Sequence, residues 1–295
     1  MTDWTPEKTA DGSYTFFSEE FQETFHSRQG AKVEAFYKFS RATNLTDAKD
    51  RDRLCLLDVC YGLGYNTGMA LETIWAANPN CHITLYALEL DASVPLGAIV
   101  PDLLEGWSVP VQGVLQDLAK DGRSQLPMLD ATMLIGDARQ TVQTLIDQEF
   151  KADSIFFDPF SPRRCPQLWS VDFFREVVRC LAPAGKLATY SRSASVRTAL
   201  QDVGLKIGTI PLEKEDWREY KAHDWSQGTI GAWEDVDLHP LTQMEREHLQ
   251  TRAATAYRDP DLTDTAAVIL QRHKETQALS QAESTTKWRK RWGIR

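Results

Sequence analysis

Long apolar runs, leader patterns and paired cysteines are all missing from this sequence. No apolar stretch in its 295 residues approaches the length of a membrane span, and the first residues, MTDWTPEKTADGS, lack the basic-then-apolar order of a signal peptide. The five cysteines are odd in number and form no C-x-x-C pair, so buried reduced thiols are expected rather than disulfides or a zinc site. These absences predict a cytoplasmic protein without a bound metal.

Two common catalytic signatures are also missing. The sequence has neither a nucleophile elbow with a Ser-His-Asp set nor a Gly-Lys-Ser/Thr phosphate loop. With 42% hydrophobic and 25% charged residues, its composition is that of an ordinary globular protein. Its length suits one large α/β domain with additions, or two small domains.

Acidic residues outnumber basic ones overall, but the end of the chain is strongly basic. The net charge of −9 gives no long-range attraction to nucleic acid, although a local basic patch can still bind phosphate. The last nine residues alternate cations with tryptophans: Lys287, Trp288, Arg289, Lys290, Arg291, Trp292 and Arg295. Either this segment follows a phosphate backbone and stacks on bases, or it is a solvated tail whose tryptophans cover the protein body.

The central part of the chain repeats a pattern of strand, turn and helix. Continuous apolar runs predict buried parallel strands, and the helical segments between them predict a doubly wound α/β sheet. We expect strands at 54–60, 82–88, 132–135, 155–157 and 186–190, and helices at 69–77, 171–181 and 195–203. Ser170 is the expected N-cap of the second helix, Gly204 follows the third, and residues 183–185 are expected to turn into the last strand.

Three segments follow from this pattern. Residues 1–50 form an aromatic-rich preamble, with a strand at 14–17 and an amphipathic helix at 31–41, that is expected to cover the ligand site. Residues 51–235 form the Rossmann-like core. Residues 236–295 form a helical extension with the basic tail, and its helical pattern covers 242–255 and 263–283.

A glycine-rich turn follows the first predicted core strand. Glycines allow close backbone approach to a ligand, and the next helix offers its free N–H groups. The candidate cofactor residues in this segment are Asp58, Tyr61, Gly62, Gly64, Asn66 and Thr67. The spacing is Gly-x-Gly-x-x-x-Gly, and a tight strand–helix turn without a ligand would also need these glycines.

Acidic residues end the next two strands. Glu89, followed by Leu90, is placed to accept hydrogen bonds from a ribose diol, although an exposed strand-end acid is the simpler alternative. Gly136-Asp137-Ala138 is placed to accept a hydrogen bond from an adenine amino group, or forms a simple turn. The order of these features matches class I methyltransferases, which use S-adenosylmethionine.

The fourth strand leads into Asp158-Pro159-Phe160-Ser161-Pro162, which resembles the Asp/Asn-Pro-Pro-Tyr/Phe motif of methyltransferases that act on amino groups. Asp158 is the candidate catalytic carboxylate and also lies beside the expected cofactor position. It would orient an uncharged nitrogen toward the methyl group, and Phe160 would stack on a base. Asp158 would be a weak base unless it is buried. The alternative is a strand end capped by an Asp-Pro turn.

Longer blocks resemble the methyltransferase part of the MnmC family. The blocks are Asp158-Pro-Phe-Ser-Pro with Pro166-Gln-Leu-Trp-Ser, Tyr61-Gly-Leu-Gly-Tyr-Asn with Glu89, and Asp11-Gly-Ser-Tyr-Thr-Phe-Phe-Ser with Phe25-His-Ser. The resemblance covers roughly residues 11–233. It departs from the family at Pro159, where the family motif has Gly or Ala, and this chain has no second glycine fingerprint for the flavin-dependent oxidase of the bifunctional enzyme.

The resemblance implies a stand-alone enzyme that transfers the methyl group of S-adenosylmethionine to the primary amine of 5-aminomethyl-(2-thio)uridine at the tRNA wobble position. A separate enzyme would then supply the aminomethyl group. His26 would help to close the site, or is a plain loop histidine. The candidate tRNA contacts are Arg28, Lys32, Arg163, Arg164, Arg192, Lys287, Arg289, Lys290 and Arg291.

Two other functions share these features. Aminopropyltransferases of polyamine synthesis have the same fold and ribose carboxylate, but they need acids around the acceptor, where this chain has Arg163 and Arg164. A catalytically inactive module that binds S-adenosylmethionine and tRNA is the second alternative. Equal tRNA binding without methyl incorporation would favour that module.

Overall fold

The computed structural model describes residues 4–212, 225–235 and 237–294. The chain forms two compact units: Met1–Phe160 with Cys180–Ala188, and Ser161–Arg179 with Thr189–Arg295. The first unit thus holds both the preamble and most of the predicted core strands. These units cut across the segments 1–50, 51–235 and 236–295, which remain a division by sequence pattern.

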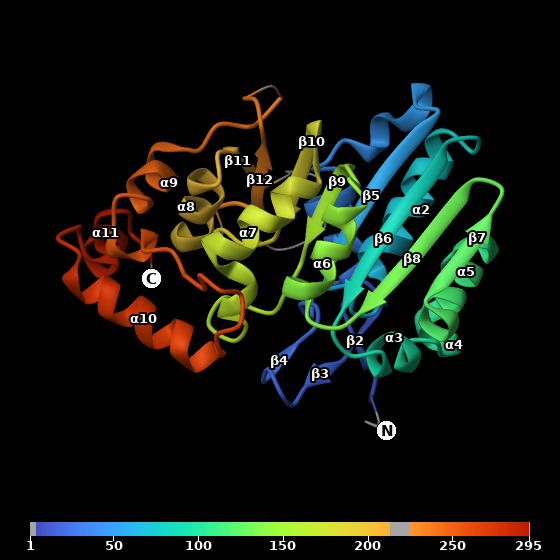
Figure 1. Ribbon diagram of the computed structural model, residues 1–295, viewed down its shortest axis with the longest axis horizontal. Helices are drawn as coiled ribbons and strands as arrows, with labels where there is room; N and C mark the ends of the chain where they lie inside the picture. Colours follow the sequence, from blue (N-terminus) through green and yellow to red (C-terminus); the bar gives the residue numbers. More distant parts are fainter. Residues whose placement is uncertain (1–3, 213–224, 236, 295) are drawn as a thin grey trace. The chain divides into compact units, whose positions relative to one another are not determined.

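The first unit is built on a twisted, mainly parallel sheet (Figure 1). Its strands follow one another in the order β10-β9-β5-β6-β8-β7, all parallel except the edge strand β7, which is antiparallel to β8. Their bounds are β5 Arg53–Val59, β6 His82–Glu89, β7 Arg123–Leu126, β8 Leu129–Ile135, β9 Ala152–Phe157 and β10 Leu181–Thr189. The five predicted strands are confirmed, and the chain winds outward in both directions from the neighbouring strands β5 and β9.

Helices cover both faces of this sheet, which is why the central strands β5 and β9 end in continuous buried runs. Helix α6 lies in front of the strands in Figure 1 and α2 lies behind them. In β5 the side chains of Leu56, Leu57 and Val59 are completely buried. The helices of this region are α2 Tyr65–Ala77, α3 Ser93–Gly97, α4 Pro101–Leu104, α5 Val109–Asp121 and α6 Ala138–Asp147.

The preamble consists of short elements before β5. Figure 1 shows the carboxyl ends of β6 and β8 pointing toward its strands. The predicted strand at 14–17 is two short strands separated at Phe16, whose side chain is buried, and the predicted helix at 31–41 opens into a π-helix after one turn. The elements are β1 Glu7–Lys8, β2 Tyr14–Thr15, β3 Phe17–Ser18, β4 Glu23–Thr24, α1 Ala31–Glu34, the π-helix Ala35–Ser40 and the 3-10 helix Leu45–Asp50.

The second unit is mostly helical around one antiparallel strand pair, β11 Lys206–Ile210 and β12 Gly228–Ala232. Its α-helices are α7 Val171–Val177, α8 Ala194–Asp202, α9 Gln243–His248, α10 Ala266–Leu279 and α11 Thr285–Arg291. Short 3-10 helices cover Pro166–Trp169, Val178–Cys180 and Arg252–Ala254. The cap predictions are confirmed, because Ser170 accepts a hydrogen bond from the Phe173 N–H and Gly204 has a φ of +95°.

The helix predicted at 171–181 is confirmed to within one residue, because α7 continues directly into the 3-10 turn Val178–Cys180 and Leu181 pairs with Ala152 as the start of β10. Two sequence expectations for this region are wrong. The turn predicted at 183–185 is a register irregularity inside that strand. The helical pattern at 242–255 is interrupted, because the Thr251 side chain accepts a hydrogen bond from Ala253 and starts a separate turn.

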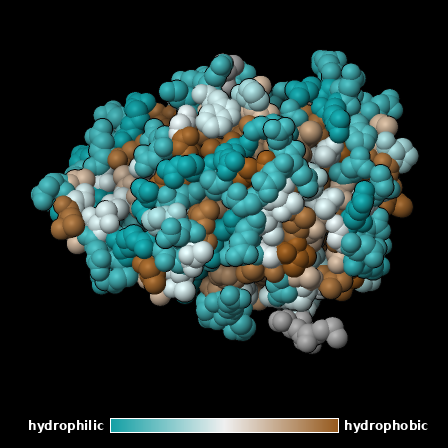
Figure 2. Space-filling model, in the orientation of Figure 1, coloured by the Kyte–Doolittle hydropathy of each residue, from teal (hydrophilic) through white to brown (hydrophobic). Residues whose placement is uncertain are grey.

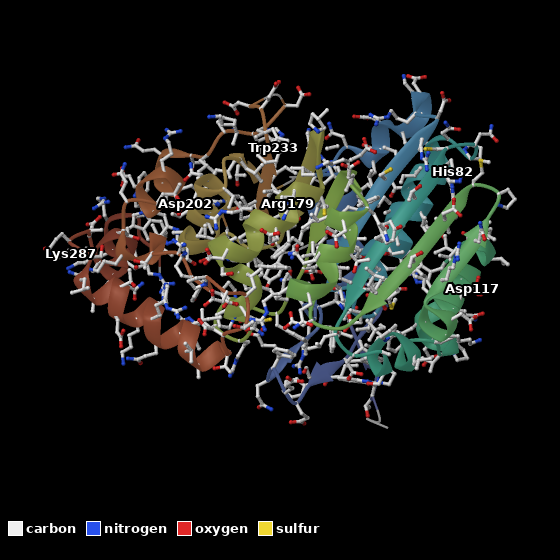
Figure 3. All side chains as sticks on the ribbon, viewed as in Figure 1. His82, Asp117, Arg179, Asp202, Trp233 and Lys287 are labelled. Atoms are coloured by element: carbon white, nitrogen blue, oxygen red, sulfur yellow. The ribbon has the colours of Figure 1, made fainter. Side chains whose placement is uncertain are left out.

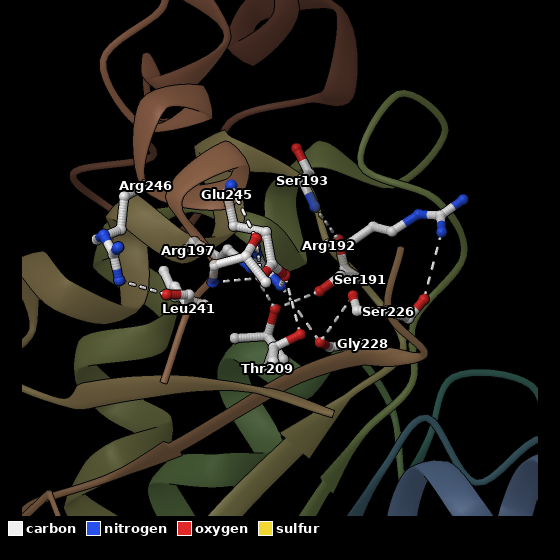
Figure 4. A network of polar contacts seen from close by, with 12 residues as sticks. Ser191, Arg192, Ser193, Arg197, Thr209, Ser226, Gly228, Leu241, Glu245 and Arg246 are labelled. Atoms are coloured by element: carbon white, nitrogen blue, oxygen red, sulfur yellow. Dashed lines mark hydrogen bonds and ion pairs between the residues drawn. The ribbon is translucent and has the colours of Figure 1, made fainter. Parts of the chain in front are cut away.

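A buried polar network organises the second unit (Figure 4). Arg197 of α8 and Glu245 of α9 form an ion pair with 2.8 Å between Nη2 and Oε1, and both side chains are fully buried. Arg197 Nε donates to Thr229 Oγ1, which donates to the carbonyl of Ser191, while Thr209 donates to Glu245. Two helices, two strands and the segment after β10 therefore meet at one ion pair.

The surface carries scattered apolar groups. On the face drawn in Figure 2, apolar residues occur in small groups between hydrophilic ones. Among the described residues, no helix is long and apolar enough to cross a membrane.

Candidate active site

The glycine turn after β5 brings the first helical residues of α2 to the carboxyl edge of the sheet. Gly62 and Gly64 have φ values of +57° and +84°, and Gly64 lies against Tyr61, whose hydroxyl would be 2.6 Å from an added Cβ. Helix α2 then begins at Tyr65, so Asn66 and Thr67 lie in its first turn, and both are buried. The turn therefore points two polar side chains back toward the ends of β5 and β9.

Asp58, near the end of β5, is completely buried. Its Oδ2 accepts a hydrogen bond of 2.7 Å from Thr67, while Oδ1 has no hydrogen-bond partner among the described residues. Burial raises the pKa of Asp58 to about 7, although the hydrogen bond from Thr67 opposes this shift. A buried carboxylate oxygen without a partner is costly, so a donor from a bound ligand would be stabilising here.

Glu89 ends the neighbouring strand β6 and is nearly buried. One of its oxygens accepts from the Gly62 N–H at 2.8 Å and the other from the Asp91 N–H at 3.0 Å. Burial raises the pKa of this carboxyl. The Leu90 N–H also donates to this carboxylate, which has about four acceptor sites and can therefore accept a further hydrogen bond. The carboxylate thus retains an acceptor site for a hydroxyl group such as that of a ribose.

Asp158 follows β9, next to β5, where the winding direction of the sheet changes. Its Oδ2 accepts a hydrogen bond of 2.9 Å from the amide of Asn66. Burial raises the pKa of Asp158 to about 8, opposed by the Asn66 bond and by the charge of Lys38 and reinforced by Glu34 and Asp58. The glycine turn and the Asp-Pro-Phe motif are thus joined by a direct hydrogen bond.

Aromatic side chains of the preamble lie over this edge. Phe160 stacks on Phe21, with ring centroids 4.4 Å apart, and meets Phe25 edge-on at 4.9 Å. Phe25 also lies beside Gly62, where its ring would be 3.2 Å from an added Cβ. The Tyr14 N–H donates to the Tyr65 hydroxyl, which ties the preamble to helix α2.

An ion pair in the preamble, Glu34 with Lys38, was not predicted from the sequence. Glu34 and Lys38 form an ion pair of 2.6 Å with both side chains largely buried, and Ser27 donates two further hydrogen bonds to Glu34. Their i, i+4 spacing among apolar neighbours was the available signal. His26 lies nearby against the Tyr65 ring, and burial lowers its pKa to about 4, so its imidazole is neutral at pH 7.

Asp137 has a structural partner in addition to its predicted role. It is the N-cap of α6, and both of its oxygens accept hydrogen bonds from Arg139, with the shortest at 2.6 Å. Gly136 has a φ of +139°, Ala138 is buried, and Leu90 is 54% exposed. The adenine contact of Asp137 stays a prediction, and it would share this carboxylate with Arg139.

The two predicted tRNA contacts of the first unit differ in how firmly their side chains are held. Arg28 is exposed and reaches Glu7 at 3.3 Å. Lys32 is held more firmly, because its ammonium group lies 4.2 Å from the Trp107 ring centre and donates to the Glu105 carbonyl.

The remaining predicted contacts lie in the second unit. Arg163 and Arg164 are exposed, and Arg192 stacks over Trp225 at 4.3 Å and donates to the Ser226 carbonyl.

The basic tail is a structured helix within the second unit. Trp288 is buried and stacks on His248 with centroids 4.1 Å apart, so this tryptophan covers the protein body. Arg291 forms ion pairs with Glu247 and Glu283. Lys287, seen on α11 in Figure 3, is exposed together with Arg289 and Lys290. Arg295 lies outside the described residues.

The residues at the sheet edge fit S-adenosylmethionine. Oδ1 of Asp58, which has no hydrogen-bond partner among the described residues, is an acceptor for an ammonium group, Glu89 can accept from a hydroxyl, and α2 starts here at Gly64 without a side-chain cap. No group of three His, Cys, Asp or Glu side chains in the described ranges could hold a metal ion. The carboxyl edge of the first unit therefore has donors and acceptors of the kind that an adenosyl amino acid requires.

Comparison with known proteins defines the class. The model of a family described as S-adenosyl-L-methionine-dependent methyltransferase matches residues 99–213. Together with the doubly wound strand order, this match identifies the chain as a class I methyltransferase that uses S-adenosylmethionine. It favours methyl transfer over the aminopropyl transfer that the sequence had left open.

Among methyltransferases, the chain is related to the methyltransferase region of MnmC. The structure of MnmC2 from Aquifex aeolicus superposes with a TM-score of 0.78 and 29% identity over 94% of this chain and 86% of that one. The tRNA 5-methylaminomethyl-2-thiouridine biosynthesis bifunctional protein MnmC of Polaromonas naphthalenivorans is 28% identical over 71% of this chain. This chain spans about a third of that bifunctional protein. An uncharacterized protein of Methanocaldococcus jannaschii is 29% identical over 91% of this chain and 71% of its own length.

Proposed function

We propose that this methyltransferase converts 5-aminomethyl-(2-thio)uridine to 5-methylaminomethyl-(2-thio)uridine at the tRNA wobble position. The observation that carries the proposal is the environment of Asp158: a carboxylate at the switch point of the sheet, bound to Asn66, with Phe160 two residues later under the aromatics of the preamble. The names of the MnmC relatives support the choice of acceptor.

The reaction needs an amine that has lost its proton. An alkylammonium group has a pKa of about 10, so most of the acceptor is charged at neutral pH and has no lone pair to attack with. An ordinary carboxylate would be a weak base for this proton. Burial raises the pKa of Asp158 to about 8, so its ionised form, which is the form that accepts the proton, is a stronger base than an ordinary carboxylate and becomes predominant above about pH 8.

When bound, S-adenosylmethionine supplies an electrophilic methyl group on its sulfonium centre. In our proposal Asp58 and Glu89 bind its polar groups, and Asp158 accepts a hydrogen bond from the acceptor nitrogen and takes up its proton. Phe160 offers an aromatic face for the uracil ring, and the stacked Phe21 and Phe25 hold Phe160 in place and exclude water. The wobble base is unpaired in the anticodon loop, so placing it against Phe160 breaks no base pair.

Exposed cations would bind the tRNA backbone. Arg28 in the first unit and Arg163, Arg164, Lys287 and Lys290 in the second are exposed and suited to phosphate contact. The aminomethyl group would come from a separate enzyme, and tRNA is the macromolecular partner in this proposal.

Incubation with labelled S-adenosylmethionine and tRNA that carries the unmethylated aminomethyl group tests the proposal. Nucleoside mass analysis is expected to show the 5-methylaminomethyl product in wild type. Asp158→Asn keeps the shape of the side chain but removes the base, so we expect turnover to fall by about 100-fold or more while cofactor affinity changes little. Normal turnover of the Asp158→Asn variant would exclude the proposed base, and methylation of another acceptor alone would exclude the proposed substrate.

A further inference from the structure

The preamble contains a buried ion pair, Glu34 with Lys38, that the methyl-transfer chemistry above does not use. The π-helix Ala35–Ser40 follows α1 directly, and π-turns within helices are rare and frequently occur at functional sites. It places Lys38 in an ion pair with Glu34 at 2.6 Å, with side chains that are only 16% and 11% exposed. Holding two charges away from water is costly, and hydrophobic residues of similar size would stabilise such a site at least as well.

This pair lies close to Asp158. The ring of Phe39 meets the ring of Phe156, two residues before Asp158, with centroids 6.0 Å apart, so the π-helix packs on the end of β9. It also packs against α2, which carries Asn66. The charge of Lys38 favours the ionised form of Asp158, and the charge of Glu34 disfavours it. Asp158 also accepts a hydrogen bond from Asn66 of α2, and the charge of Asp58 of β5 disfavours its ionised form.

Glu34 is held ionised by its own partners. Burial alone would raise its pKa, but Lys38 and the hydrogen bonds from Ser27 lower the pKa to about 2. Glu34 therefore keeps its negative charge at every working pH and fixes the ammonium group of Lys38 beside it. The result is that the ammonium group of Lys38 is held in place by a counter-charge that is itself fixed by Ser27.

We propose that Asn66 and Lys38 are positioning residues of the methyl-transfer site: Asn66 fixes one oxygen of the Asp158 carboxylate, and Lys38, anchored by Glu34, balances its charge when it gives up or takes a proton. Asn66 thereby leaves Oδ1 of Asp158 directed to the acceptor nitrogen. This assignment gives Asn66 a role other than the cofactor contact expected from the sequence. It rests on the proposed function only in naming the acceptor as an amine.

Titration of Asp158 itself tests the proposal without any acceptor. In protein labelled with ¹³C at the aspartate carboxyl groups, the Asp158 signal is the one that disappears in Asp158→Asn, and its chemical shift against pH gives the apparent pKa. We expect Lys38→Met to raise this value and Glu34→Gln to lower it, each by about half a unit or more, because the two substitutions remove opposite charges. Lys38→Arg should keep the wild-type value. The double variant Glu34→Gln/Lys38→Met lacks both charges, so the apparent pKa of Asp158 should return close to the wild-type value.

The acidic limb of the pH–rate profile should move in the same directions. Asn66→Ala should lower kcat by about 10-fold or more while its affinity for S-adenosylmethionine, measured by calorimetry, stays within a few-fold of wild type. Shifts of the same sign in Lys38→Met and Glu34→Gln, or no shift in either, would overturn the role of Lys38. Loss of cofactor affinity in Asn66→Ala would return Asn66 to the cofactor site. If wild type fails to methylate the tRNA while Asp158 titrates as described, the acceptor is wrong and the positioning role stands.

Discussion

Removing one side of the Arg197–Glu245 ion pair should strongly destabilise the second unit. Arg197→Met keeps much of the side-chain volume but leaves the Glu245 carboxylate buried opposite an apolar group. Glu245 would retain the hydrogen bonds from Thr209 and from Thr242, so it would be partly satisfied rather than isolated. Loss of one partner of a buried pair costs about 3–5 kcal/mol, and we expect a value near the lower end, about 3 kcal/mol.

The double variant separates the charge effect from packing. Glu245→Gln retains an oxygen that can accept from the Thr242 N–H, so the capping box of α9 is largely preserved. In Arg197→Met/Glu245→Gln no buried charge remains, and we expect the loss to fall to about 1 kcal/mol, about 2 kcal/mol less than in Arg197→Met alone.

Urea unfolding followed by circular dichroism measures these free energies, and hydrogen exchange of peptides from 189–212 and 225–250 places the effect in the second unit. Because Glu245 can take up a proton in the single variant, its deficit should shrink as the pH is lowered toward 5. A deficit below about 1 kcal/mol for Arg197→Met, or a coupling energy near zero, would show that the buried pair does not hold the unit together.

Two further predictions concern the first unit. Because the pKa of Asp58 is raised from 3.8 to about 7, the stability that this group contributes is present below about pH 4 and lost by pH 7. Relative to wild type, Asp58→Asn should therefore gain stability between pH 5 and pH 8, as measured by urea midpoints, while losing affinity for S-adenosylmethionine. A difference between variant and wild type that is the same at both pH values would contradict the buried carboxyl group. Gly64→Ala should lower stability by about 1–3 kcal/mol in thermal unfolding, because its φ is +84° and its new Cβ would lie 2.6 Å from the Tyr61 hydroxyl. The control Gly113→Ala lies inside α5 with open space around its Cβ, so its stability should match or exceed that of wild type.

The central strands β5 and β9 could be predicted because burial on both faces leaves a continuous apolar run at the end of each strand. Their polar ends, Asp58, Glu89 and Asp158, were predicted to share one edge, and parallel pairing brings them there. Strand β7 could not be predicted in this way, since its sequence Arg-Ser-Gln-Leu buries only Ser124 and has the composition of a loop.

The contacts between distant segments were beyond the sequence pattern. Nothing in the spacing of Arg197 and Glu245, 48 residues apart, indicates that they pair. A π-turn has the same residue types as an α-helix, so the position of Lys38 relative to Asp158 also required the three-dimensional structure. The Asn66–Asp158 hydrogen bond joins two motifs that the sequence placed near the same ligand but did not connect.

Because α11 is anchored by contacts within the second unit, its exposed cations have fixed positions. With Trp288 buried against His248 and Arg291 clamped by two glutamates, Lys287 and Lys290 project from a fixed scaffold about one helical turn apart. This segment has already lost its conformational entropy when the protein folds. In the proposed tRNA complex such a surface would select phosphates whose spacing matches its own, whereas a flexible basic arm would adapt to any nucleic acid.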